Sequence, residues 1–410
     1  MKVWVKLLIG SILGFVLGTL LPSENTSVAA ALDFLYKLVL GAGRYTAAPI
    51  VVFSLTIGIY ELRQDGCFWK LLFRSFLVLI IGSVFVIGLG MAVTLIFSPD
   101  RIPILIDEQA GEIIFNSAQN ILDIFPSNML TVFAGDGKYL FPFCVLAFAI
   151  AIGLGYDRNY TKPVLALIDS LSRIFFHIAT LFSEIFAVLI IVLSAYWSWQ
   201  YKNVVNISVF TSVMRLLLIF SLILTLLVFP LFLYFLKHNQ KPWKTLYGIL
   251  APAISAFFSG DMNFNIPILL MHLKENLGIR RRSSAVTVSL WSTFGRCGSA
   301  MVASVAFIVI LKSYSSLDIG LVDVISIGVR ALLISFLLAR NSADAAYMAL
   351  AVLCMQYGRG FENGYLILKP VAFYLIAVGA FLDVVITALG SFIVAFLSGF
   401  TEERPVKKYI

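Results

Sequence analysis

Residues 255–267 read SAFFSGDMNFNIP and interrupt a segment that is otherwise apolar from Leu246 to Leu273. Basic residues flank this segment on both sides, which favours placing both of its ends on the cytoplasmic face of a membrane. A segment with both ends on one face cannot cross, so it must enter, turn at its polar centre and return. Non-helical backbone is tolerated at membrane depth only where protein or a wet cavity surrounds it. The stretch therefore predicts a re-entrant helical hairpin.

The composition of the whole chain fits a membrane environment. Of its 410 residues, 60% are hydrophobic and 13% are charged, and the mean hydropathy is +0.97, which a soluble globular domain would not reach. A spanning helix takes about 20 apolar residues, so the chain holds at most roughly ten or eleven such segments. Apolar runs predict helices at about 3–21, 33–62, 68–98, 119–155, 163–198 and 203–238, with an external loop at 98–119 and a break at 129–138.

The basic residues lie where membrane topology would put them, at the ends of alternate apolar runs. The net charge of +8 therefore needs no nucleic-acid partner. The positive-inside rule predicts a multi-pass protein of a bacterial-type plasma (inner) membrane with both termini cytoplasmic. We interpret the run 3–21 as a retained helix and not as a signal peptide, because many spans follow it. The flanking residues are Lys2, Lys6, Arg63, Lys70, Arg74, Arg158, Lys162, Lys237, Lys241, Lys244, Lys274, Arg280, Arg281, Arg282, Lys407 and Lys408.

The first apolar run carries Gly10, Gly14 and Gly18 at four-residue spacing. Such a stripe of small residues lets another helix approach closely. We expect it to serve helix packing.

The residues that could carry enzyme chemistry are scattered. Neither a metal site nor a disulfide framework is indicated, since there is no C-x-x-C pair and no His at ligand spacing. There is also no Walker A motif, no H-E-x-x-H and no nucleophile with a plausible base, so catalytic residues are not expected and an enzyme is disfavoured. The residues concerned are Cys67, Cys144, Cys297, Cys354, His177, His238 and His272.

Two further apolar segments in the C-terminal half have polar centres. The run at about 284–312 contains Ser292–Ser299, STFGRCGS, whose glycines on either side of Arg296 predict an unwound helix. The run from Leu321 to Tyr357 is interrupted by 339–344, ARNSAD, and predicts a second hairpin that enters from the opposite face.

A last helix at about 365–400 carries Asp383 and Thr387 one turn apart. The order is therefore hairpin, broken helix, hairpin, helix. Two such pairs entering from opposite faces indicate an inverted repeat with a binding site at the midplane, as in a secondary transporter.

The segment from Leu246 to Phe400 resembles the transport core of the dicarboxylate/amino acid:cation symporter (glutamate transporter) family. The resemblance implies an all-α polytopic fold of about eight transmembrane helices and two re-entrant hairpins, an elevator mechanism and a homotrimer in lipid. The matching stretches are Asn265–Pro267, His272–Ile279, Met348–Leu353, Phe381–Asp383 with Thr387, and Ala48–Ser54.

The resemblance also implies a division of the chain into scaffold and transport core. Scaffold helices 1 and 2 occupy 1–67, the third helix at 68–98 belongs to the core, and scaffold helices 4 and 5 occupy 99–202. The rest of the core is 203–400, and a cytoplasmic tail is 401–410.

Several family positions are replaced in this chain. The serine-rich first tip aligns with Asp261–Asn263 and the second tip with Arg340–Ala343, while Ile386 stands where the family has an Arg. Sodium needs hard oxygen ligands. The family's side-chain ligands for the cation align with Gly295, Cys297, Gly390 and Val394, which supply no side-chain oxygen, although backbone carbonyls could still form one site. We expect no cofactor, and Na⁺ or H⁺ coupling, a reduced sodium requirement or exchange all stay open.

Asp383 matches the family residue that holds the amino group of an amino-acid substrate, and it pairs with an ammonium through a charge-assisted hydrogen bond. Arg296 has two functional interpretations: it grips a substrate carboxylate with its planar fork, or it is a permanent counter-ion to Asp261 or Asp383 in place of a bound sodium ion. A structural ion pair is the third possibility.

Arg340 and Asp344 are four residues apart and could simply pair with each other. The alternative places Arg340, Asn341 and Ser342 at an extracellular gate that touches substrate. Hydrogen bonds to substrate are expected from Thr387, Ser299, Asn263 and Asn265, whereas Arg44 and Arg330 have no predicted role.

The sequence thus predicts a secondary active transporter of an amino acid or dicarboxylate, acidic such as glutamate or aspartate, with proton coupling or reduced sodium coupling. The alternative is an uncoupled facilitator, exchanger or channel for small organic anions or neutral amino acids.

Overall fold

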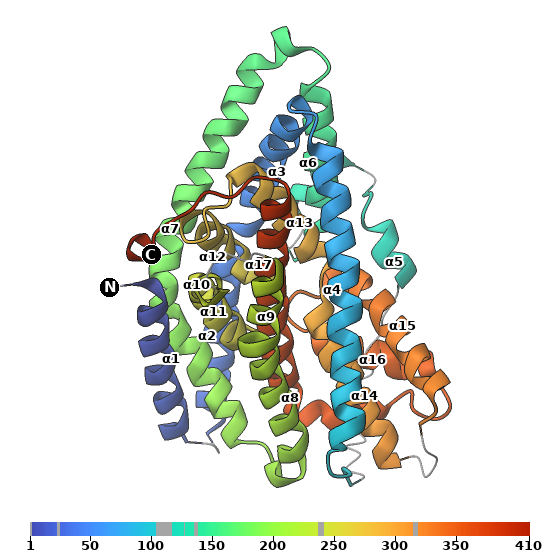
Figure 1. The fold of residues 1–410 in the computed structure, drawn as a ribbon. Helices are drawn as coiled ribbons and strands as arrows, with labels where there is room; N and C mark the ends of the chain where they lie inside the picture. Colours follow the sequence, from blue (N-terminus) through green and yellow to red (C-terminus); the bar gives the residue numbers. More distant parts are fainter. Residues whose placement is uncertain are drawn as a thin grey trace.

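The computed structural model describes residues 2–22, 25–103, 117–126, 128–134, 138–236, 242–314 and 319–410. Helices form nearly all of its regular structure, and they pack side by side along one long axis (Figure 1). Within these ranges, eight helical stretches are long and apolar enough to cross a membrane, which confirms the predicted all-helical membrane fold. They are Val3–Leu20, Thr26–Gln64, Phe68–Phe97, Asn159–Lys202, Ile207–Leu236, Arg281–Tyr314, Leu321–Arg340 and Gly364–Leu397.

The individual helices are shorter than these stretches because several are interrupted. The α-helices are α1 (Val3–Leu20), α2 (Thr26–Arg44), α3 (Ala47–Gln64), α4 (Phe68–Phe97), α5 (Ser117–Leu122), α6 (Phe141–Leu154), α7 (Arg158–Lys202), α8 (Thr211–Ile223), α9 (Phe229–Leu236), α10 (Pro242–Gly248), α11 (Leu250–Ser259), α12 (Met262–Glu275), α13 (Arg281–Phe294), α14 (Cys297–Tyr314), α15 (Leu321–Leu337), α16 (Ala345–Tyr357) and α17 (Ala372–Leu397). Shorter helical turns are Met129–Ala134, Ile207–Phe210, Leu224–Val228, Leu338–Arg340, Gly364–Val371 and Val406–Lys408.

Two predicted helices are not continuous. The predicted helix 33–62 is divided into α2 and α3 at Tyr45, and Pro49 lies in the first turn of α3, where a missing N–H costs no helical hydrogen bond. The predicted run 119–155 is divided near its predicted break at 129–138, since its described parts are α5, a 3₁₀ turn at Met129–Ala134 and α6. The predicted loop lies largely outside the described residues, as do Gly135, Gly137, Lys237, Lys241 and His238.

The polar stretches in the C-terminal half lie where the chain turns or unwinds. Hairpin 1 consists of α11 and α12, which meet at its tip, Gly260. The φ of Gly260 is +63°, a conformation that glycine adopts without strain, and the Asp261 carboxylate caps α12 by accepting from Asn263 N at 2.9 Å. Its arms have 10 and 14 residues, fewer than a membrane span needs. Hairpin 2 consists of α15 and α16, and residues 295–296 separate α13 from α14.

The glycine stripe of α1 packs against α7. A Cβ atom added at Gly14 would lie 2.0 Å from Ser194 Oγ and 2.1 Å from Ile191 O, and one at Gly18 would lie 2.0 Å from Ser198 Oγ. The two backbones therefore approach as closely as glycine allows, which confirms the predicted packing role.

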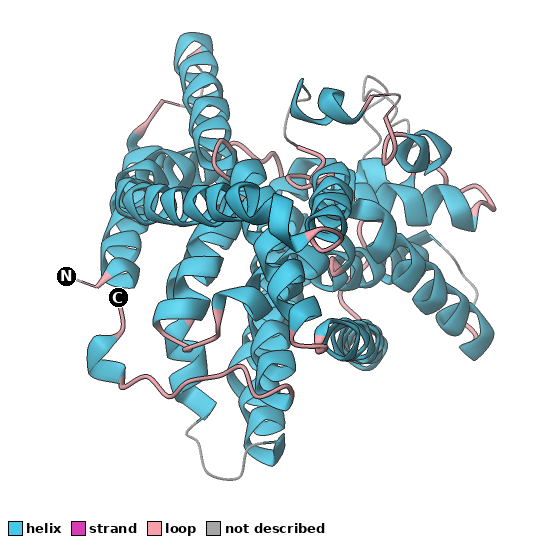
Figure 2. Ribbon diagram, turned by 90° about the horizontal axis from the view of Figure 1, so that it is seen from above, coloured by secondary structure: helices cyan, strands magenta, loops and turns pink. Residues whose placement is uncertain are grey.

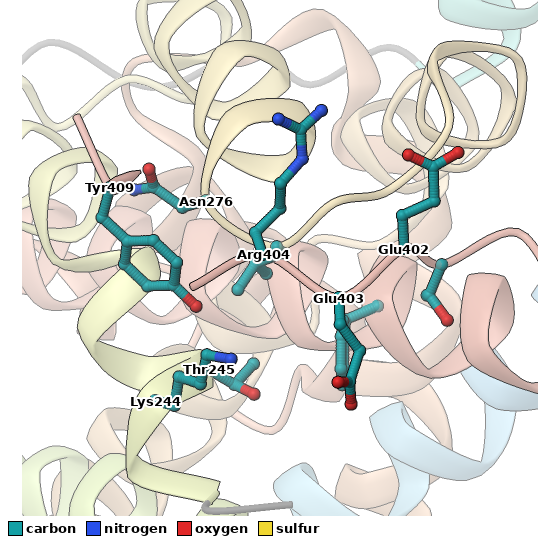
Figure 3. Close-up of a pocket in the computed structure, with 10 residues that line it drawn as sticks. Lys244, Thr245, Asn276, Glu402, Glu403, Arg404 and Tyr409 are labelled. Atoms are coloured by element: carbon teal, nitrogen blue, oxygen red, sulfur yellow. The ribbon is translucent and has the colours of Figure 1, made fainter. Parts of the chain in front are cut away.

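The N-terminal and C-terminal ends of the described chain lie side by side (Figure 2). Lys2 Nζ donates to Val406 O at 3.5 Å, and the N–H of Ile410 donates to Asn276 Oδ1 at 3.0 Å. The tail crosses the base of hairpin 1 and encloses a hollow of only about 30 Å³, beside which Asn276 and Tyr409 lie (Figure 3). Both chain ends thus lie beside the base of hairpin 1.

We expect Gly14→Leu to destabilise the protein by at least about 1–3 kcal/mol, because the new side chain would overlap the backbone of α7. Thermal unfolding of the purified protein in detergent measures this effect. Gly88→Leu in α4 is the matched control, since no heavy atom lies within 4 Å of a Cβ added there. Equal stability of the two variants would contradict the close α1–α7 contact.

Candidate functional site

The tips of the two hairpins meet in the interior. Met262 N donates a long hydrogen bond of 3.4 Å to Ser342 O, so the start of α12 touches the connection between α15 and α16. A Cβ added at Gly260 would lie 2.7 Å from Ile376 Cγ2, which places α17 directly beside the first tip. The hairpins, far apart in sequence, therefore converge on one helix.

Asp383 of α17 is fully buried and is held by Ser299 at the start of α14. Ser299 N donates to Asp383 Oδ1 at 3.0 Å, and Ser299 Oγ donates to Asp383 Oδ2 at 2.5 Å. Two glycines allow this approach: a Cβ at Gly298 would lie 2.7 Å from Asp383 N, and one at Gly379 would lie 3.0 Å from Ser299 Oγ. The structure therefore brings together two of the predicted substrate residues.

Arg296 lies in the break between α13 and α14 and is only 1% exposed. None of its three side-chain nitrogens has a hydrogen-bond partner among the described residues. The acidic groups that act on its charge are Asp383 and Asp261, yet it forms an ion pair with neither within that part of the chain. An uncompensated charge in a protein interior is costly. A bidentate carboxylate is the partner that best fits a guanidinium.

Asp261 already has a different cationic partner. Arg44, the last residue of α2, donates from Nε to Asp261 Oδ2, and its side chain is 15% exposed. Sequence reasoning missed this role, although a lone arginine in an apolar run was a signal that a buried carboxylate lies nearby. Arg44 thus pairs with Asp261, whereas Arg296 has no hydrogen-bonded carboxylate among the described residues.

Two other predicted polar residues of hairpin 1, Asn263 and Asn265, donate hydrogen bonds within the protein. Asn263 Nδ2 donates to Lys138 O at 2.7 Å, while Asn265 Nδ2 donates to Ser259 Oγ at 2.9 Å and to the Asp261 carbonyl at 2.6 Å. In the described part of the chain, Asn265 Oδ1 and Thr387 Oγ1 are buried without a partner. These two oxygens remain available to a ligand.

A cavity of about 1120 Å³ opens onto the second tip. Arg340 contributes to its wall but pairs with Asp123, not with Asp344, so the predicted local ion pair is not formed. The cavity also borders Arg44 and thereby reaches the ion pair at the first tip. Its lining includes Asp33, Tyr36, Lys37, Arg44, Asp123, Lys138, Tyr139, Tyr196, Arg340, Asn341, Ser342 and Asp344.

Comparison with known proteins shows to which family this chain belongs. The profile of the sodium:dicarboxylate symporter family matches residues 3–398. The chain belongs to this family. It is therefore a multi-pass membrane transporter and not an enzyme, as the sequence predicted.

Several curated relatives carry transporter names. The serine/threonine transporter SstT of Lacticaseibacillus paracasei is 25% identical over 309 residues, which are 73% of this chain and 67% of that protein. The proton/sodium-glutamate symport protein of Bacillus subtilis is 24% identical over 326 residues, covering 75% and 73%. The human neutral amino acid transporter B(0) is 32% identical over 94 residues, covering 23% and 17%.

Gly390 and Val394, which align with cation positions of the family, pack against apolar groups. A Cβ at Gly390 would lie 2.3 Å from Cη2 of Trp291, so an indole ring packs directly on this position. Val394 is a fully buried apolar residue. Across the described residues, no group of three His, Cys, Asp or Glu is arranged to hold a metal ion.

We expect Arg44→Gln and Asp261→Asn each to destabilise the protein by about 3–5 kcal/mol, because each leaves a buried charge unpaired. The double variant should lose clearly less than the sum of the two. Chemical denaturation of the purified protein measures this coupling. The exposed pair Asp33 and Lys37, with side chains 42% and 72% exposed, is the control and should give a coupling of at most about 0.5 kcal/mol. Additive losses at Arg44 and Asp261 would contradict the buried pair.

Proposed function

We propose that the protein is a secondary transporter of an amino acid that binds between the hairpin tips, the α13–α14 break and α17. The observation that carries this proposal is the buried guanidinium of Arg296, which lacks a hydrogen-bond partner among the described residues. The substrate carboxylate binds Arg296 through paired hydrogen bonds. The substrate ammonium binds Asp383, which Ser299 orients.

The charges around the tips favour a substrate with no net charge. Arg296 and Arg44 are positive, Asp383 and Asp261 are negative, and all four side chains lie in the interior or at its edge. A zwitterionic amino acid preserves this balance. An acidic substrate such as glutamate or aspartate adds one negative charge, so it is the second candidate, and a co-transported proton would offset that charge.

In this proposal the substrate crosses the membrane by an elevator mechanism. Residues 68–98 and 203–400 move together against the scaffold of a homotrimer. Ion pairs join the two parts at both ends of the molecule. Arg281 of the core pairs with Asp169 and Arg282 with Asp65, while Arg340 pairs with Asp123 at the opposite tip. The shared position of the two chain ends supports a topology with both termini in the cytoplasm.

A thermal-shift screen of the purified protein against amino acids and dicarboxylates tests the proposed substrate site. At least one amino acid should raise the Tm of the wild type, and both Arg296→Gln and Asp383→Asn should abolish that rise.

Arg215→Gln is the control for loss of a positive charge, since Arg215 is exposed on α8 and donates to Thr211 O. It should retain the full ligand-induced rise. A ligand effect that survives in Arg296→Gln, or no effect from any compound, would count against the proposal.

A further inference from the structure

Trp291 of α13 packs its indole ring directly on Gly390 of α17. Its ring atoms Cη2, Cζ2 and Cζ3 would lie 2.3–2.6 Å from a Cβ atom at Gly390, and the side chain is 1% exposed. Its Nε1 donates to Ser75 Oγ of α4 at 3.0 Å, which fixes the ring from a third helix. The indole N–H is a donor only, so this side chain offers a cation no lone pair.

Both carboxylates near the break are already engaged. Asp383 accepts two hydrogen bonds from Ser299, and Asp261 accepts from Arg44 and from Asn263 N. The buried side-chain oxygens left without a partner in the described chain are neutral hydroxyl or amide groups. They are Ser255 Oγ, Asn265 Oδ1, Thr387 Oγ1 and Ser391 Oγ, together with Thr46 and Thr225 Oγ1 and Ser283 Oγ.

Arg296 adds a fixed positive charge to the same region. Its charge acts on both Asp383 and Asp261, although it hydrogen-bonds to neither. In an interior of low dielectric this charge stabilises the two carboxylates and repels any further cation close to them. A sodium ion would therefore have to bind beside a guanidinium. Among the described side chains, its ligands would be neutral oxygens and two carboxylates that are already engaged, so backbone carbonyls would have to supply the rest.

We infer that Arg296 is a built-in cation that takes the place of a co-bound sodium ion, with Trp291 filling the adjacent space. The core is then ready to bind a substrate carboxylate without sodium. The part of this inference that concerns substrate rests on the proposed function, whereas the part that concerns sodium can be tested with no substrate present.

The first test measures the Tm of the purified full-length protein in NaCl, KCl and choline chloride at equal ionic strength. The wild type should unfold at the same temperature in all three salts. Arg296→Gln should show a saturable rise of Tm specific to sodium, because Asp383 then lacks its neighbouring cation. Arg296→Lys retains the charge and should behave like the wild type.

A saturable, sodium-specific rise in the wild type would overturn the inference. So would an Arg296→Gln protein that folds but stays as insensitive to sodium as the wild type. Neither result depends on which substrate the protein carries.

Calorimetric titration of the wild type with L-serine and with L-glutamate provides a measurement that needs no variant. An apparent Kd that is the same in NaCl and choline chloride supports the inference, and a Kd that is tighter in sodium overturns it while leaving the proposed function intact. Binding of neither amino acid would count against the proposed substrates, and the Tm comparison would then decide the role of sodium.

Discussion

A permanent positive charge buried in the break of a helix is the constraint on which this core depends. Arg296 lies between α13 and α14 without a hydrogen-bond partner in the described chain. Because burying a charge costs free energy, the nearby carboxylates determine how well the charge of Arg296 is compensated. Asp261 is paired with Arg44, and Asp383 is held by Ser299, so the guanidinium has no hydrogen-bonded carboxylate among the described residues. The proposed binding of a substrate carboxylate follows from this arrangement.

The sequence predicted those parts of the fold that depend on local chemistry. The polar tip at Gly260, the break at Arg296 and the glycine stripe containing Gly14 were visible because glycine and polar residues are unusual inside apolar segments. Sequence also placed Asp383 and Ser299 among the site residues, and the structure brings them into contact. The mutual geometry of these groups could not be read from spacing, since they come from different helices.

Other features depend on tertiary contacts and left only a weak signal. The pair of Arg44 with Asp261 joins residues 217 positions apart, and nothing local identifies its partner. Trp291 looked like an ordinary apolar residue, although it packs on Gly390 and determines what fits there. The break at 129–138 was predicted, but the separate helix α5 before it was not. Membership of the sodium:dicarboxylate symporter family fixes the fold, and in our proposal Arg296 and Trp291 determine which ion accompanies the substrate.

The most direct measurement is a high-resolution structure of the protein bound to the amino acid that raises its Tm most. Our account predicts both substrate carboxylate oxygens within about 2.7–2.9 Å of Arg296 guanidinium nitrogens, and the substrate ammonium beside Asp383. A substrate bound elsewhere, with Arg296 paired directly to Asp383 or Asp261, would contradict it.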